Sequence, residues 1–232
     1  KAFSLAIDRT YIVNQVTQSG QVEAGGFVPA GVYDAEGATG DDFRTVGGDY
    51  YKPTDADYEA NCEEARALLA EAGYENGEGF PVVEYLYNTS DAHKAVAEAL
   101  QYMWEEELGV KVTLNNQEWA AFLQTRKDGD YSIARNGWIA DYNDPISFLD
   151  MWMTGGGNND AQYSNEEYDS LIKEAKTTTD VKERMELLHK AEDKIIGEDN
   201  ALAPLYFYTQ KYMLADGIEG MYYCPLGYFF FG

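Results

Sequence analysis

The chain has 232 residues, enough for one large α/β domain or two small ones, and its apolar content of 45% supports a sizeable core. Its 17 Lys and Arg against 41 Asp and Glu give a net charge of −24, which argues against nucleic acid and against an anionic membrane surface as partners. No apolar stretch is long enough to span a bilayer, and Cys62 and Cys224 form neither a metal motif nor a disulfide framework, which leaves one bridge or two free thiols.

The first half of the chain alternates between helical and strand patterns of apolar residues. Residues 1–16 carry an apolar helical face interrupted by Asp8 and Arg9, and residues 19–53 are a Gly-, Asp- and Tyr-rich loop with little periodicity. Helices are predicted over residues 57–72, 92–108 and 117–127, and strands over 81–88, 110–114 and 131–134. Gly73 and Gly109 follow the first two of these three helices, where glycine commonly ends a helix.

The second half continues the same alternation. Ser164 with Glu167 predicts a capping box, and Asp180 with Glu183 predicts a second helix start. Residues 203–208 read as a buried strand, and residues 226–231 form an apolar strand that needs a partner sheet. Strands that alternate with helices predict an α/β fold with a largely parallel or mixed sheet.

Residues 131–149 hold the most informative pattern, a strand that runs through a turn into a helix. We expect Asp144 to cap that helix and Pro145 to occupy its first position. Open α/β sheets place ligands at such strand-to-helix loops, and the groups of this loop could together grip a zwitterion: the cation Arg135, the indole of Trp138 and the carboxylates of Asp141 and Asp144. Simpler roles stay open: a turn for Asp141, a surface charge for Arg135 and core packing for Trp138.

Known catalytic and metal motifs are missing from the sequence. There is no nucleotide-binding glycine loop, no serine-hydrolase elbow and no HExxH zinc motif, and the cluster at Asp141 to Asp144 lacks the later ligands of an EF-hand. Asp141 and Asp144 could serve a glycosidase, but a capping role for Asp144 is favoured. We therefore predict no catalytic residue, no metal and no cofactor.

Several motifs in chain order carry a resemblance to a known family. They are AIDR at 6–9, YNTSDxHK at 87–94, LGV at 108–110, NQEW at 116–119 and ARxGWxADY at 134–142. Together they resemble the C-terminal large lobe of oligopeptide-binding proteins of ABC importers, the extracellular solute-binding proteins of family 5. The resemblance implies a type 2 periplasmic-binding-protein-like lobe, with a mixed sheet flanked by helices, as a fragment of a larger two-lobe protein.

The same resemblance implies a binding site for peptides. In such proteins an extended peptide is enclosed between the lobes and held by main-chain hydrogen bonds. The resemblance assigns the peptide's α-amino group to Asp141, its carboxylate end to Arg135 and His93, and a groove wall to Tyr208. Trp138, in the same motif as Asp141, completes the expected peptide-binding set. His93 also has a simpler reading, as a residue that merely sits at a helix N-terminus.

The expected function is that of the extracytoplasmic substrate-binding component of an ABC transporter, which captures short peptides and delivers them to the permease. It is not an enzyme, and it meets the membrane only through the permease or a lost lipid anchor, as a periplasmic protein or a cell-surface lipoprotein. One alternative keeps the fold and binds an oligosaccharide, a nickel complex or haem; a more distant one is a carboxylate-dependent hydrolase.

Two expectations concern the extent of the chain. Its start without methionine or a signal segment indicates a processed piece of a longer protein. Residues 1–209 are expected to form the C-terminal peptide-binding lobe, and residues 210–232 to be a crossover segment returning to a missing N-terminal lobe. Without that lobe, we expect the apolar tail either to pack on its own lobe or to pair with a second copy in a dimer.

Overall fold

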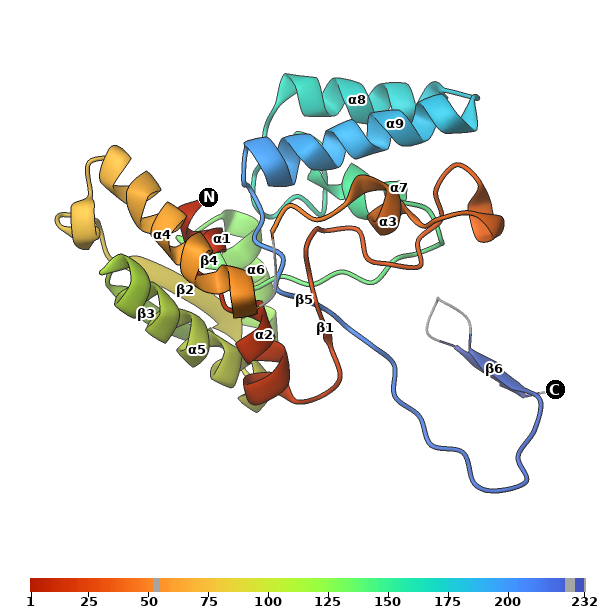
Figure 1. Cartoon of the computed structure of the whole chain (residues 1–232), viewed down its shortest axis with the longest axis horizontal. Coiled ribbons are helices and arrows are strands. Elements are labelled where there is room, and N and C mark those ends of the chain that lie inside the picture. The colour runs from red at the N-terminus through yellow and green to blue at the C-terminus, as the bar shows by residue number, and fades with distance from the viewer. Residues whose placement is uncertain (52–54, 224–227, 232) are drawn as a thin grey trace.

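The structure, a computed structural model, describes residues 1–51, 55–223 and 228–231 (Figure 1). The α-helices are α1 Ala2–Leu5, α2 Arg9–Tyr11, α3 Phe43–Gly47, α4 Asp55–Glu71, α5 Asp91–Leu108, α6 Trp119–Asp128, α7 Ile146–Leu149, α8 Glu166–Thr177 and α9 Val181–Glu192. Short 3₁₀ turns lie at Gly37–Thr39, Glu75–Gly77 and Asp150–Trp152, and π-helical turns at Ile12–Thr17 and Asp193–Glu198. The strands are β1 Val22–Glu23, β2 Val83–Asn88, β3 Val112–Gln117, β4 Ile133–Ala134, β5 Tyr206–Phe207, β6 Met221–Tyr223 and β7 Phe229–Phe231.

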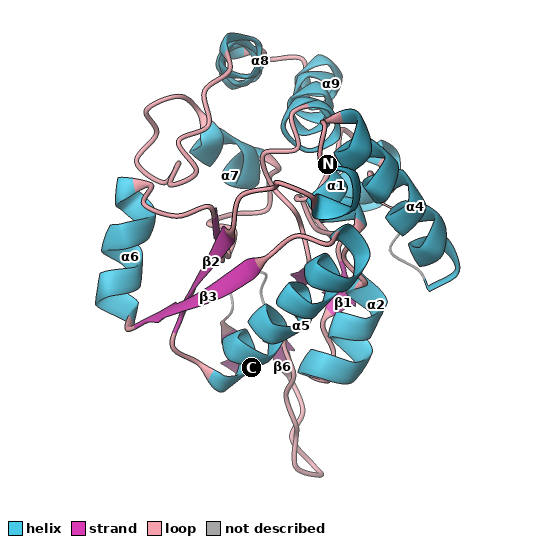
Figure 2. Cartoon of the chain, turned by 90° about the vertical axis from the view of Figure 1, so that its left-hand side faces the viewer, coloured by secondary structure: helices cyan, strands magenta, loops and turns pink. Residues whose placement is uncertain are grey.

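A three-stranded parallel sheet in the order β3-β2-β4 organises the lobe. Its central strand β2 is buried on nearly every residue, as expected for a strand covered on both faces. The helices α5 and α6 lie on either side of the sheet (Figure 2). The α/β prediction is therefore confirmed, and the antiparallel pairs β1-β5 and β6-β7 lie outside this sheet.

The helix ends follow local chemistry. Gly109 ends α5 in the left-handed conformation (φ 66°), and Gly73 follows α4 with φ 92°, as predicted. Asp180 caps α9 by accepting a hydrogen bond from the Glu183 N–H, also as predicted.

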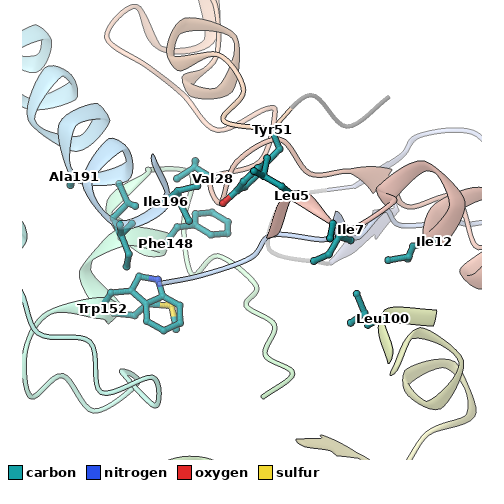
Figure 3. Close-up of a cluster of buried hydrophobic side chains, with 14 of the residues drawn as sticks. Leu5, Ile7, Ile12, Val28, Tyr51, Leu100, Phe148, Trp152, Ala191 and Ile196 are labelled. Carbon is teal, nitrogen blue, oxygen red and sulfur yellow. The ribbon is translucent and has the colours of Figure 1, made fainter. Parts of the chain in front are cut away.

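The apolar faces of these elements form one cluster. Figure 3 shows it running from Ala191 and Ile196, past Phe148 and Trp152, to the N-terminal segment. The helical hairpin α8–α9 is therefore part of the same core as the sheet.

The predicted helix over residues 1–16 is wrong in one respect, because it breaks after α1. The Asp8 carboxylate accepts a hydrogen bond from the Tyr11 N–H at 2.7 Å and starts a new helix. Arg9 then turns inward, where its guanidinium donates to the carbonyls of Pro204 and Ser4. Of the polar pair that interrupts the apolar face, Asp8 thus caps the second helix and Arg9 is buried.

Three other predictions need correction. The prediction of a capping box at Ser164 is wrong, because Asn165 caps α8: its side chain accepts hydrogen bonds from the Glu167 and Tyr168 N–H groups. The strand at residues 110–114 instead spans Val112–Gln117. The buried strand at 203–208 shrinks to Tyr206–Phe207 and is only half-buried, since its sole described partner is the two-residue strand β1.

The tail beyond residue 209 folds on itself. Strands β6 and β7 pair antiparallel with Met221 opposite Phe231, and this hairpin extends from the body of the lobe (Figure 1). Phe230 stacks on Tyr222 with ring centroids 5.0 Å apart, yet both rings remain largely exposed. The boundary at residue 209 and the dimer stay predictions. Cys62 is a buried free thiol, whereas Cys224 lies outside the described residues.

Candidate functional site

The carboxyl edge of the parallel sheet presents three polar side chains. Strand β2 ends at Asn88, and Arg135 directly follows β4, where its N–H donates to the Leu86 carbonyl at 2.8 Å. The Arg135 guanidinium donates to Asn88 Oδ1 at 3.5 Å, and His93 lies in the first turn of α5 just beyond. No carboxylate within residues 1–51, 55–223 and 228–231 forms an ion pair with Arg135. This edge of the sheet therefore offers an uncompensated cation.

Tyr208, directly after β5, lies at the same edge of the sheet and contacts Arg135. Its hydroxyl accepts a hydrogen bond from Arg135 Nη2 at 3.3 Å, and its ring meets Tyr206 edge-on with centroids 5.3 Å apart. The short pairing of β5 with β1 fixes this tyrosine-bearing segment. Tyr208 remains 56% exposed, so its ring is free to contact a ligand.

The loop after Arg135 carries Trp138 and Asp141, and buried Ser147 shapes it. The Trp138 indole N–H donates to the Ser147 carbonyl at 2.7 Å, and the Asp141 N–H donates to Ser147 Oγ at 2.9 Å. Asp144 Oδ1 accepts the Ile146 N–H at 2.9 Å, as a capping side chain does, but α7 begins at Ile146 with Pro145 at its N-cap, so the predicted start is one residue too early. The Asp141 carboxylate is thus left exposed on a loop whose backbone is held in place.

A cavity of about 1050 Å³ joins these features. Four of the five predicted binding residues line it: His93, Arg135, Trp138 and Tyr208. Asp141 itself is not among the lining residues, although its neighbours Ala140 and Tyr142 are. Asp141 therefore lies beside the cavity, exposed between two neighbours that line it.

Two regions that line this cavity, around Arg135 and around Tyr142, differ in electrostatic character. Burial, followed by the Arg135 charge, lowers the pKa of His93 below its ordinary value. Burial, followed by the carboxylates of Asp150, Asp144 and Asp141, raises the pKa of Tyr142. The surroundings of His93 thus carry a positive charge and those of Tyr142 carry negative charges, which suits a ligand that bears both charges.

Sequence reasoning missed several residues that build the site. Asn143 accepts from the Tyr33 N–H at 2.8 Å and donates to the Gly31 carbonyl at 3.0 Å, which joins the loop of Asp141 to an N-terminal loop that also lines the cavity. Asn143 lies within residues 131–149, the most informative stretch of the sequence, so that stretch could have indicated it. Arg126 contacts the turn after Arg135. No sequence motif indicated this role, because its partners Asp160 and Asn136 lie in other segments of the chain.

Other kinds of site were sought in the described parts of the chain. No group of three or more His, Cys, Asp or Glu side chains there is arranged to hold a metal ion. None of the helices in those parts combines the length and apolarity needed to cross a membrane.

The parallel sheet and the cavity at its carboxyl edge define an α/β lobe with a groove of ligand size. Comparison with known families is more specific: residues 1–160 match the family described as "Bacterial extracellular solute-binding proteins, family 5 Middle". The chain belongs to this family, as the sequence motifs predicted.

Individual relatives agree. The chain is 38% identical over 230 residues to the dipeptide-binding protein DppE of Bacillus subtilis, a match that covers 98% of this chain and 40% of the relative. It is 37% identical over 219 residues to the periplasmic oligopeptide-binding protein OppA of Salmonella typhimurium, covering 94% of this chain and 38% of the relative. The chain thus spans about two fifths of the length of these relatives.

A solved structure supports the fold. The crystal structure of Haemophilus influenzae OppA in complex with RPPGFSPFR has a TM-score of 0.75 and 34% identity to this chain. The match covers 89% of this chain and 38% of that one. The predicted fold class, a periplasmic-binding-protein-like lobe, is therefore confirmed.

Proposed function

We propose that this chain is the peptide-binding lobe of an extracytoplasmic binding protein, which captures short peptides and delivers them to an ABC permease. The observation that carries the proposal is a groove lined by Arg135, whose guanidinium has no ion-pair partner among the described residues, and flanked by the exposed Asp141. A peptide with free ends has complementary charges at its own two ends. The relatives named for dipeptide and oligopeptide binding support this choice of ligand.

Each predicted residue then has a role. Asp141 receives the α-ammonium group, while Arg135 and His93 receive the carboxylate end. Trp138 and Tyr208 supply apolar surface, with Tyr208 also holding Arg135. Charge-assisted hydrogen bonds in a groove closed to water are stronger than neutral ones, so these contacts supply much of the affinity. Capture of this kind needs no bond cleavage, and we propose no catalytic residue, metal or cofactor.

The family supports a proposal on location. A protein of the extracellular solute-binding kind acts outside the cytoplasm, either free in a periplasm or attached to the cell surface. The permease is the partner that receives the peptide.

Calorimetry on the full-length protein that carries this sequence tests the proposal. Asp141→Asn should weaken the binding of free tetra-alanine about 10-fold to 100-fold, because a hydrogen bond to a charged group contributes about 1.5–3 kcal/mol. Glu106→Gln is the matched control, since it removes one exposed carboxylate from α5, away from the groove. Equal affinities for the two variants would exclude Asp141 from the site.

Mass spectrometry of ligands that copurify with the protein tests the ligand class. A mixture of short peptides supports the proposal. A single glycan, haem or a nickel complex would overturn it in favour of another solute on the same fold.

A further inference from the structure

We infer that two ion pairs outside the predicted ligand contacts position the two ends of the groove independently. Arg126–Asp160 positions the end that reads the peptide's carboxylate, and Arg184–Asp144 positions the end that reads its ammonium group. The inference rests on the proposed function, and it adds Arg126 and Arg184 as positioning residues that set which peptide termini are accepted.

Arg126 of α6 holds the turn that carries Arg135. Its Nε lies 2.7 Å from Asp160 Oδ2, and both side chains are mostly buried, with 13% and 14% exposed. Its Nη1 donates to Asn136 Oδ1 at 2.9 Å and lies 3.5 Å from the Arg135 carbonyl oxygen. Asn136 Oδ1 also accepts the Gly137 N–H at 2.8 Å. The guanidinium thus fixes the backbone on the C-terminal side of Arg135.

Asp160 is itself fixed in place. The Tyr131 hydroxyl donates to the Asp160 carbonyl at 2.7 Å, just before β4 begins. The pair therefore joins three segments, namely α6, the start of β4 and the loop of Asp160. Without Asp160, Arg126 loses the partner that aims its guanidinium at the turn.

Arg184 of α9 holds the other end. Its Nη1 and Nη2 reach Asp144 Oδ2 and Oδ1 at 2.8 and 2.9 Å, a bidentate arrangement that fixes the carboxylate in two directions. The same Asp144 caps Ile146, and its carbonyl accepts the Ser147 N–H at 3.1 Å. Ser147 Oγ in turn accepts the Asp141 N–H. The chain of contacts thus runs from Arg184 to the backbone of Asp141.

The two pairs share no residue and lie on different helices, α6 and α9. Sites without shared partners tend to act additively. Loss of one pair should therefore disturb one end of the groove and leave the other end intact. A merely stabilising role would instead weaken both ends together.

The test uses the full-length protein and three probes: free tetra-alanine, its N-acetyl form and its C-terminal amide. The affinity ratio of free to amidated peptide measures carboxylate recognition, and the ratio of free to acetylated peptide measures ammonium recognition. Arg126→Gln should reduce the first ratio about tenfold and leave the second unchanged, and Arg184→Gln should do the reverse. Each variant is the control for the other.

A double variant separates positioning from direct contact, because Arg126 also lines the cavity. If Arg126 acts through Arg135, then Arg126→Gln should have no further effect on the carboxylate ratio in an Arg135→Gln background. A further loss in that background would mean that Arg126 contacts the ligand itself. If a glutamine variant does not fold, Arg126→Lys and Arg184→Lys replace it in the same measurement, because lysine keeps the positive charge but lacks the planar guanidinium group.

Unchanged ratios in both variants would overturn the inference, as would equal losses of both ratios in each variant. If the unmodified protein binds the free, acetylated and amidated peptides equally well, the proposed reading of peptide ends fails instead. The two failures are thus distinguishable.

Discussion

The buried pair between Glu192 and Arg44 anchors the N-terminal wall of the groove, and its removal should strongly destabilise the lobe. Glu192 is fully buried, and its Oε1 lies 2.8 Å from Arg44 Nη1. The same oxygen accepts the N–H groups of Phe27 and Val28, both at 2.8 Å. Burial disfavours the charged guanidinium, but Glu192 more than offsets this and raises the pKa of Arg44.

Glu192→Ala removes the charge and three hydrogen bonds at once. Breaking a buried ion pair by deleting one partner costs about 3–5 kcal/mol, because the remaining buried charge, here Arg44, keeps only the longer contact of 3.8 Å to the exposed Asp49. We expect a loss of that size in the free energy of unfolding. Glu192→Gln should lose less, because an amide oxygen can still accept the Phe27 and Val28 N–H groups.

Urea unfolding followed by circular dichroism measures the effect. Glu186→Ala is the matched control, since it removes an exposed carboxylate from the same helix and should change stability by less than about 0.5 kcal/mol. Replacing both Glu192 and Arg44 by Met should cost less than Glu192→Ala alone, because no unpaired charge remains. A loss below about 1 kcal/mol for Glu192→Ala would refute the reasoning.

Three further outcomes are expected, each measured by urea unfolding. Gly109→Ala should cost about 1–3 kcal/mol, because the residue has φ 66° and a Cβ there would lie 2.2 Å from the Asn76 carbonyl oxygen; a neutral effect would contradict the strain. Tyr168→Phe should cost about 1–3 kcal/mol, because the hydroxyl donates to the buried Leu149 carbonyl. The pKa of His93 is lowered in the folded protein, so between that pKa and the ordinary value of 6.5 the unfolded state binds more protons than the folded state. The free energy of unfolding should therefore fall as the pH falls through this range. His93→Asn should flatten this fall, and an unchanged pH profile would contradict it.

The sequence predicted the elements whose signals are local. Apolar periodicity with Gly109 and Gly73 located α5 and α4, and Asp180 located the start of α9. Prediction failed where two short polar residues competed for one role, as with Ser164 and Asn165. Only the three-dimensional position of the neighbouring N–H groups decides which of them caps the helix.

The residues expected to bind a peptide rest on a different kind of signal. The motif residues Arg135, Trp138, His93 and Tyr208 do line one cavity, but the resemblance to a family brought them together rather than periodicity. The supporting contacts of Arg184 and Glu192 join segments far apart in the chain, and nothing in the local pattern of α9 distinguishes them from ordinary charges on a helix.

The pairing of β1 with β5 has a consequence for the order of folding. This ladder joins Val22 to Phe207, whereas β2 and β3 are linked through a single helix. Closing a long loop costs more chain entropy than closing a short one, and a two-residue ladder returns few hydrogen bonds for it. We expect the β2-α5-β3 unit to form early and the β1-β5 junction to close late.

Pulse-labelling hydrogen exchange during refolding would reveal this order. The Ala24 amide, which donates to the Leu205 carbonyl, should gain protection after the Val83 amide, which donates to Lys111. Simultaneous protection would contradict it. Because Tyr206 and Tyr208 lie on the late segment, the groove acquires its last wall only when the distant strands β1 and β5 have paired.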